Sequence, residues 1–494
     1  PGAIYIVISA KGTGKTQGLI PLALKFNSVY GSFNRIALGR EECHKIGLDY
    51  IDDLITPRNS KRIGSVIDSN YKISPEMLAN MGLYLADEFD QVAEHSFGDT
   101  CNKDGKRPII LNTFEAQLNT ALAGGGAGLF MSADITQKEI DYLKALAPVG
   151  IPVRVIINHY KPEKGVLHFD ESKNPDGLIE LLIENLENGI PTFVIDDIKN
   201  GVRGCKSIAE YVRTLHPEWA SKIVEINSDT SGDPETIAYI KNINQGSENT
   251  LLLCCSPSVV SGISLTNGRF NQSVFGFFHG VLTVSQASQA LSRVRGAQSV
   301  CVWAAEQGLV YAANRATDPR EINNYYQRNY EANSKHIQAF KPEYEPLKHE
   351  WLSPHWELYC KNAAYRNLCM NKLRERLKAK LEAEGYQIVS INSDESKTVE
   401  KGLKASWSKV ELDYAESLNK VEIFSDNELD VINYQSTPLT PEEKLRFDKT
   451  MLLKQFGEEL IQATTFTHRE SGKQLQGYPA MYLKNERGVF QQQL

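Results

Sequence analysis

The chain has few of the features that mark membrane, secreted or zinc-ribbon proteins. No apolar stretch approaches the ~18 residues of a membrane-spanning helix, and the densest run, Leu251–Cys255, has the length of a buried strand. Eight cysteines in 494 residues include no Cys-x-x-Cys pair, which excludes a disulfide scaffold and a zinc ribbon. The N-terminus has no signal-peptide pattern. We therefore expect a cytoplasmic protein from a reducing compartment, without a membrane partner.

An excess of basic residues is also missing. The 54 Lys and Arg residues are outnumbered by 61 Asp and Glu residues, which gives a net charge of −7. This balance argues against a protein that coats nucleic acid by bulk charge, but it allows a local basic channel. The hydrophobic share of 41% is ordinary for a globular chain and excludes a disordered or fibrous one. The length predicts two to four domains.

Short apolar runs that alternate with helical patterns predict two successive parallel sheets with crossover helices. The first set of predicted strands is Ala3–Ser9, Arg35–Leu38, Met81–Ala86 and Gly128–Ser132. A second set begins near Pro152, and its predicted strands are Val153–Asn158, Thr192–Ile195, Ile223–Ile226, Thr250–Cys255, Ser273–Phe278 and Ser299–Ala304.

These patterns predict an α/β fold with one sheet lobe over residues 1–150, a second over 151–310, and a mainly helical accessory region over 311–494. In that last region a helix is expected over Glu357–Glu384, and residues 387–435 are expected to form a loop or irregular insert. Thr440 is expected to cap another helix. The basic run Lys361–Lys380 suits either a solvated helix face or a nucleic-acid contact.

The strongest motif is a glycine-rich loop between a predicted strand and a helical run, Ser9-Ala-Lys-Gly-Thr-Gly-Lys15-Thr16. Its glycines allow the backbone N–H groups to wrap a phosphate. Lys15 can reach the β- and γ-phosphates, and the Thr16 hydroxyl can bind Mg²⁺. The expected ATP-binding residues are Ser9, Gly12, Thr13, Gly14, Lys15 and Thr16.

An acidic box, Asp87-Glu88-Phe89-Asp90, follows the predicted strand at Met81–Ala86. At such a strand end, Asp87 can position Mg²⁺ together with Thr16, and Glu88 can orient and deprotonate the attacking water. An ATP hydrolase needs both this box and the phosphate loop, and the sequence contains both. We therefore predict that the protein uses ATP and Mg²⁺.

A third motif lies late in the second predicted sheet, where Gln289, Arg293 and Arg295 are expected on a polar-faced helix. An arginine that reaches the γ-phosphate stabilises the charge of the transition state. Arg295 is the favoured arginine finger, with Arg293 in support and Gln289 ordering water nearby. The alternative is a surface helix that carries two arginines.

The order of these motifs resembles superfamily 2 helicases, in particular the group of the herpesvirus origin-binding helicase and cyanobacterial plasmid replication proteins. The segments that carry the resemblance, besides the phosphate loop and the acidic box, are Asn34–Arg40 (motif Ia), Val66–Ser69 (motif Ib), Met131–Asp134 (motif III), Ser256–Ser264 (motif V) and Gln289–Arg295 (motif VI). Asn34 stands where the family usually has His, and Asp134 where it usually has Thr.

The resemblance implies two RecA-like lobes that close on ATP, with single-stranded or forked DNA across them. It assigns nucleic-acid contacts to Arg35, Arg40, Ser69, Ser258 and Ser261, a nucleotide contact to Gly262, and coupling roles to Ser132 and Asp134. The expected function is a DNA helicase or translocase in replication of a plasmid, phage or other mobile element. The alternative is a replication initiator that hydrolyses ATP without unwinding. From the abrupt start we expect that an N-terminal part is absent, and the resemblance implies that it carries further replication domains.

Overall fold

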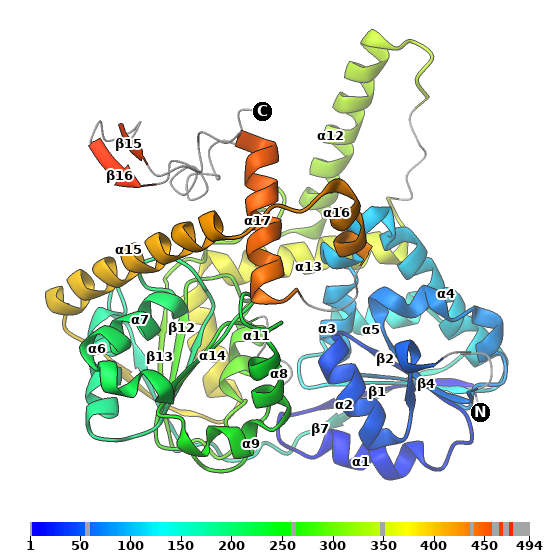
Figure 1. Ribbon diagram of the computed structural model, residues 1–494. Helices are drawn as coiled ribbons and strands as arrows, with labels where there is room; N and C mark the ends of the chain where they lie inside the picture. The colour runs from blue at the N-terminus through cyan, green and yellow to red at the C-terminus, as the bar shows by residue number, and fades with distance from the viewer. Residues whose placement is uncertain are drawn as a thin grey trace. The chain divides into compact units, whose positions relative to one another are not determined.

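The computed structural model describes residues 2–54, 60–257, 263–345, 351–434, 439–456, 464–467 and 474–477 (Figure 1). The chain divides into two compact units that exchange segments along the sequence. Unit 1 contains residues 1–164, 283–285 and 306–386, and unit 2 contains residues 165–282, 286–305 and 387–494. The region after residue 310 is therefore shared between the two units.

Unit 1 is built on a seven-stranded parallel sheet with the order β3-β4-β2-β5-β6-β1-β7. Its strands are β1 (Ala3–Ser9), β2 (Val29–Phe33), β3 (Asp49–Tyr50), β4 (Arg62–Val66), β5 (Leu83–Asp87), β6 (Ala127–Ser132) and β7 (Val153–Asn158).

One strand prediction for this part of the chain is wrong, and one predicted strand is present but belongs to the other sheet. The segment Arg35–Leu38 enters a helix, because the strand expected there, β2, has already ended at Phe33. The segment Val153–Asn158 does not open the second sheet. It pairs with β1 along its whole length and forms the edge of the first sheet.

Unit 1 also contains several helices. They are α1 (Lys15–Ala23), α2 (Ile36–Ile46), α3 (Phe89–His95), α4 (Arg107–Ala123), α5 (Gln137–Leu146), α12 (Pro319–Phe340), α13 (Pro354–Asn371) and α14 (Leu373–Ala383). Aromatic side chains fill the core between helices and sheet, where Tyr84 packs edge-on against Tyr30 and Phe89 against Phe130. Figure 1 shows α12 as a long helix that extends away from the sheet of this unit.

The helix expected over Glu357–Glu384 is split into α13 and α14, because Lys372 leaves the helical region of backbone space. The basic residues of this segment contact acidic partners within unit 1. Lys361 pairs with Asp141 of α5 at 3.3 Å, and Arg366 pairs with Glu94 of α3 at 3.1 Å. These ion pairs attach α13 to the helices beside the acidic box.

Unit 2 contains a second seven-stranded parallel sheet with the order β10-β11-β9-β12-β13-β8-β14. Its strands are β8 (Val166–Asp170), β9 (Thr192–Asp196), β10 (Ile223–Ile226), β11 (Leu252–Cys255), β12 (Val274–Phe278), β13 (Ser299–Ala304) and β14 (Gln387–Ile391). Its longer helices before residue 300 are α6 (Asp176–Glu187), α7 (Cys205–Leu215), α8 (Pro234–Lys241) and α11 (Val284–Leu291).

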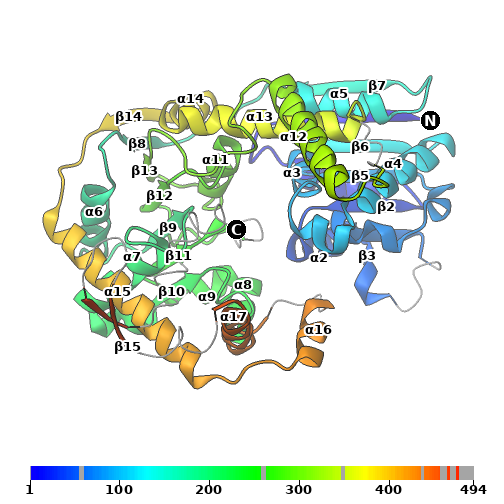
Figure 2. The same cartoon turned by 90° about the horizontal axis from the view of Figure 1, so that it is seen from above.

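Residues 387–435 are not the loop that the sequence predicts. They contain β14, α15 (Lys397–Lys420) and α16 (Asp426–Tyr434). Helix α15 lies along α7 and α6 (Figure 2), with Val399 and Leu403 in the core of unit 2. The expected helix after Thr440 is confirmed as α17 (Pro441–Phe456), and Thr440 and Glu443 exchange the hydrogen bonds of a capping box.

The predicted fold class is confirmed: two tandem RecA-like parallel-sheet lobes carry a helical C-terminal region. All eight cysteines are buried and none forms a disulfide, as the absence of a disulfide scaffold predicts. No helix in the described parts of the chain is both long and apolar enough to cross a membrane.

Gly232 lies against the backbone just before the start of α17, within unit 2. A β-carbon at this glycine would lie 1.9 Å from the carbonyl oxygen of Leu439, and Lys444 of α17 pairs with Asp229 nearby at 2.7 Å. We expect Gly232→Ala to weaken the docking of α17 by about 1–3 kcal/mol. Amide exchange in α17 should then accelerate by roughly 5- to 150-fold.

Gly18→Ala is the matched control for this substitution. Gly18 lies inside α1, and a β-carbon there would meet nothing within 4 Å. Because alanine favours helix, this change should leave the amide exchange of α17 unaltered. Unchanged exchange in Gly232→Ala as well would contradict the close approach.

Candidate active site

The predicted motifs of unit 1 converge on one edge of its sheet. Because all seven strands are parallel, their carboxyl ends lie at the same edge, which is where α/β sheets bind ligands. Along the strand order, the residues at or just after these ends are Ser69 after β4, Arg35 after β2, Asp87 at β5, Ser132 at β6, Ser9 at β1 and Asn158 at β7.

The phosphate loop runs from the end of β1 into α1, which begins at Lys15. Gly12 and Gly14 have φ angles of 78° and 79°, a left-handed conformation that glycine adopts at little cost. The Lys15 ammonium donates hydrogen bonds to the carbonyl oxygens of Ser9 and Ala10, at 2.9 and 3.1 Å. The loop therefore places a cation and a helix N-terminus together, an arrangement that binds phosphate.

Side-chain hydrogen bonds hold the first turn of the loop. The hydroxyls of Ser9 and Thr13 are 2.6 Å apart, and Thr13 also donates to the carbonyl of Ala10 at 2.7 Å. Asn158, at the end of β7, donates to the Ser9 hydroxyl at 3.0 Å. The serine that stands at the first motif position is thus used as a link between β1 and β7.

The acidic box meets the phosphate loop directly. Thr16 donates from its hydroxyl to a carboxylate oxygen of Asp87 at 2.8 Å, across 71 residues of sequence. Both groups are hard oxygen ligands of the kind that Mg²⁺ prefers, and Asp87 is only 7% exposed. Burial, followed by the charge of Glu88, raises the pKa of Asp87 to about 6. A bound cation would stabilise the ionised carboxylate of Asp87, so Thr16 and Asp87 fit a magnesium site.

Glu88 follows with a left-handed backbone, φ 50°, which a non-glycine residue adopts only where the surrounding structure enforces it. Its carboxylate accepts a hydrogen bond from the Ser132 hydroxyl at 3.1 Å, and its own N–H donates to Asp87 at 2.9 Å. Burial, and then the charges of Glu88 and Asp134, raise the pKa of Asp90 to about 8. Asp90 therefore holds its proton more readily than an ordinary aspartate.

Two further motifs contact the acidic box and its helix. The Ser132 hydroxyl, which donates to Glu88, accepts from the backbone N–H of Asp134 at 3.2 Å. Asn34, which is buried, donates from its side chain to Gln91 of α3 at 2.9 Å. Motif III is thus hydrogen-bonded to the acidic box, and motif Ia to the helix α3 that follows it.

The predicted nucleic-acid residues of unit 1 lie at the same sheet edge. Arg35 is half-buried directly before α2, and Ser69 follows β4, the neighbour of β2. Arg40 is exposed, pairs with Asp53 at 2.8 Å and stacks over the Tyr50 ring at 4.6 Å. The other predicted contacts, Ser258, Ser261 and Gly262, lie outside the described residues.

In unit 2 the structure corrects the expected helix for the third motif. Helix α11 ends at Leu291, so only Gln289, which is buried, lies on it. Arg293 and Arg295 flank Val294, which forms a parallel bridge with Leu265. Arg295 is exposed and donates to Ser264 at 3.4 Å. Both arginines lie in turns beside this bridge, Arg293 half-buried and Arg295 exposed, so the pairing of the two arginines stays a prediction.

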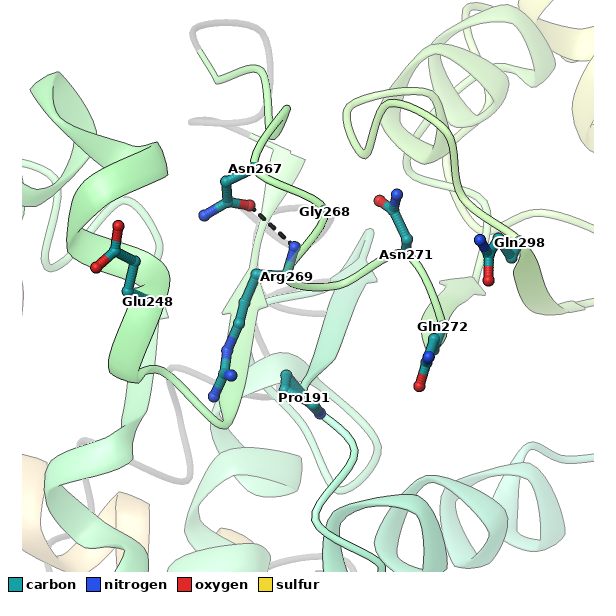
Figure 3. A pocket seen from close by; sticks show the side chains of 8 residues that line it. All are labelled: Pro191, Glu248, Asn267, Gly268, Arg269, Asn271, Gln272 and Gln298. Atoms are coloured by element: carbon teal, nitrogen blue, oxygen red, sulfur yellow. Dashed lines mark hydrogen bonds between the residues drawn. The ribbon is translucent and has the colours of Figure 1, made fainter.

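A pocket of about 540 Å³ lies at the opposite end of the unit 2 strands (Figure 3). Pro191, Gln272 and Gln298 line it, each one or two residues before the start of β9, β12 or β13. Its one arginine, Arg269, is held by the carbonyl of Thr250 at 3.1 Å. The pocket therefore lies at the amino ends of the strands of unit 2, away from their carboxyl ends, and we assign no function to it.

Sequence reasoning missed the residues that support the phosphate loop from outside. Lys11, within the loop, pairs with Glu384 after α14 at 2.9 Å and with Asp134 at 3.3 Å. Asn158 contacts Ser9 as described above. No local signal could have identified Glu384, because 373 residues separate it from its partner.

The chain matches no known family profile. An uncharacterized protein of Picosynechococcus sp. (strain ATCC 27264 / PCC 7002 / PR-6) is 27% identical over 460 residues, which cover 87% of this chain and 45% of that protein. The chain thus spans about half the length of the curated relative it matches.

Similar solved structures include the DEAD-box helicase Mss116 bound to single-stranded RNA and UDP-BeF, at 13% identity and a TM-score of 0.47, covering 90% of this chain and 89% of that one. Mycobacterium smegmatis helicase Lhr bound to single-stranded DNA and AMP-PNP has 15% identity and a TM-score of 0.45, covering 66% and 46%. S. cerevisiae Dbp5 bound to RNA and ADP BeF3 has 12% identity and a TM-score of 0.45, covering 82% and 90%. The function of this chain therefore rests on its own site residues.

Proposed function

We propose that the chain is an ATP-dependent nucleic-acid helicase or translocase that acts on single-stranded or forked DNA. The observation that carries this proposal is the contact between Thr16 and Asp87 at the edge of the sheet in unit 1. It joins a phosphate loop to an acidic box, the two parts that ATP hydrolysis requires. A role in replication of a plasmid, phage or other mobile element follows the resemblance of the motifs.

Each residue at this edge has a proposed task. Lys15 exchanges the carbonyls of Ser9 and Ala10 for the outer phosphates of ATP, while Gly12, Thr13 and Gly14 present backbone N–H groups. Thr16 and Asp87 hold Mg²⁺, which supplies charge neutralisation at the phosphates when bound. Glu88 accepts the proton of the attacking water.

The remaining motif residues have proposed roles in coupling and in the transition state. Ser132 and Asp134 transmit changes at Glu88, because Ser132 contacts its carboxylate. Arg295 is the proposed finger, supported by Arg293 and Gln289. Arg35, Arg40 and Ser69, together with Ser258 and Ser261, are proposed to hold the nucleic-acid backbone, with Gly262 at the nucleotide. We propose that residues 1–150 contain the phosphate loop and the acidic box, and that residues 151–310 contain motifs V and VI.

Single-stranded DNA should raise the rate of ATP hydrolysis, and the stimulation should fade with salt because phosphate contacts are screened. Arg40→Ala should weaken DNA binding and lower the slope of log affinity against log salt by about 1. Arg320→Ala is the control, since this arginine is 87% exposed on α12 and pairs with Asp318, two residues before it. If log affinity had the same slope against log salt in both variants, Arg40 would not contact the DNA backbone.

A second candidate function is a replication initiator that closes on DNA without unwinding it. The motifs are common to both functions, so a strand-displacement assay with ATP separates them. Duplexes with a 3′ tail, a 5′ tail and blunt ends should be compared. Displacement of a tailed duplex supports the helicase, whereas DNA-stimulated hydrolysis without displacement supports the initiator.

A further inference from the structure

Five charged side chains of unit 1 form a cluster beside the phosphate loop, which we call the loop–helix network. Lys11 of the loop contacts Asp134 at 3.3 Å and Glu384 at 2.9 Å. Glu384 contacts Lys164 at 3.0 Å and Lys380 at 3.3 Å, and Lys380 contacts Asp134 at 2.5 Å. The network thus joins the phosphate loop, motif III and the end of α14.

The network is buried where it meets the loop. The side chains of Lys11, Asp134 and Glu384 are 8%, 4% and 15% exposed. Removing charges from water is costly unless partners compensate. Burial would raise the pKa of Glu384, but the charges of Lys11, Lys164 and Lys380 lower it overall. Glu384 is therefore held ionised among lysines.

Glu384 is placed against the preferences of its own helix. It is the C-cap of α14, where the helix dipole disfavours a negative charge. Its pairing with Lys380 has the less favourable order, because the acid is C-terminal to the base. The apolar residues Leu373, Leu377 and Leu381 already anchor α14 by burial. The carboxylate therefore serves its partners outside the helix rather than the helix itself.

Lys11 precedes a position of the loop that has open space beside its backbone. Its neighbour Gly12 has a left-handed backbone, and a β-carbon there would meet nothing within 4 Å. On the other side, the carbonyl of Ala10 accepts from both Thr13 and Lys15. Polar contacts, not apolar ones, consequently fix the direction of the backbone where the phosphate binds.

We propose that Glu384 is a positioning residue for the phosphate loop, acting through Lys11, so that docking of α14 and binding of ATP favour each other. The inference rests on the proposed ATP-binding function and adds a form of regulation to it. Because coupling between two binding events is reciprocal, nucleotide should also protect α14 from opening. A change that separates the end of α14 from the phosphate loop should weaken nucleotide binding.

The test measures the Kd of a fluorescent non-hydrolysable ATP analogue with Mg²⁺, on the full chain without DNA. Glu384→Gln should raise the Kd by about 5- to 50-fold. Glu375→Gln is the matched control on the same helix, because its carboxylate is 70% exposed and pairs with Lys372. We expect that control to bind as the wild type does. Equal Kd values for the wild type and Glu384→Gln would overturn the inference.

A double-mutant cycle tests whether Glu384 acts through Lys11. Lys11→Met should weaken binding, and adding Glu384→Gln to it should weaken binding little further, whereas additive effects would overturn the coupling. Lys11→Arg, which keeps the charge, should restore most of the affinity. If Glu384→Gln fails to fold, comparing the Kd values of Lys11→Met and Lys11→Arg tests the inference without it.

Hydrogen exchange supplies a readout that a purely structural role would not move. The analogue should slow amide exchange in α14 of the wild type and should not do so in Lys11→Met at saturating analogue. Slowing of equal size in both would overturn the inference while leaving ATP binding intact. A wild-type chain that binds no analogue would instead refute the proposed function and the inference with it.

Discussion

Replacing Lys15 by alanine should lower the rate of ATP hydrolysis by at least about 10²-fold and leave the fold intact. Clamping cations on a transferring phosphoryl group contribute at this level. The Lys15 ammonium donates hydrogen bonds to two loop carbonyls, so its loss removes a phosphate ligand rather than core packing. Steady-state hydrolysis at saturating single-stranded DNA is the measurement, with circular dichroism to verify folding.

Lys25→Ala is the matched control for this prediction. Lys25 is exposed just beyond the C-terminal end of α1, so the variant has the same change of charge on the same unit. It should hydrolyse ATP at the wild-type rate. If Lys15→Ala retained a rate within a few-fold of Lys25→Ala, the loop would not be the site of ATP hydrolysis.

The motifs of unit 1 could be predicted because each one is local in sequence. The loop around Lys15 and the acidic box at Asp87 each consist of a few consecutive residues next to an apolar strand. Their contact also follows from sequence, since parallel strands bring their carboxyl ends to one edge. The residues that support the loop, Lys11 and Glu384, could not be paired, because tertiary packing alone brings them together.

The errors in the fold have local physical causes. The apolar residues after Arg35 resemble a strand but begin α2, while the true strand β2 contains Gly31. A β-carbon at Gly31 would lie 2.9 Å from Leu48. The glycine that interrupts the apolar pattern of β2 is therefore needed for packing. Strand β14 was missed because it is an edge strand with exposed side chains, which gives no continuous apolar run.

Glu88→Gln should bind ATP with near wild-type affinity and hydrolyse it about 10²- to 10⁴-fold more slowly, the range for loss of a general base. The amide keeps the shape of the side chain and can still accept from Ser132, whose hydroxyl lies 3.1 Å from the carboxylate. It cannot take a proton from the attacking water. The Kd of a non-hydrolysable analogue and the single-turnover rate of hydrolysis separate the two effects.

Asp90→Asn decides which acid of the box is the base. Because burial and the charges of Glu88 and Asp134 raise the pKa of Asp90 to about 8, its carboxyl holds its proton more readily than an ordinary aspartate and is the poorer proton acceptor. Asparagine has nearly the shape and charge of that protonated acid, so Asp90→Asn should lower the rate of hydrolysis by less than about 10-fold at pH 7.

The two variants must be compared at the same pH and at saturating DNA. A larger loss in Asp90→Asn than in Glu88→Gln would transfer the role of base to Asp90, because only an ionised carboxylate there could activate water. The opposite order assigns the proton to Glu88, whose left-handed backbone holds its carboxylate beside Ser132.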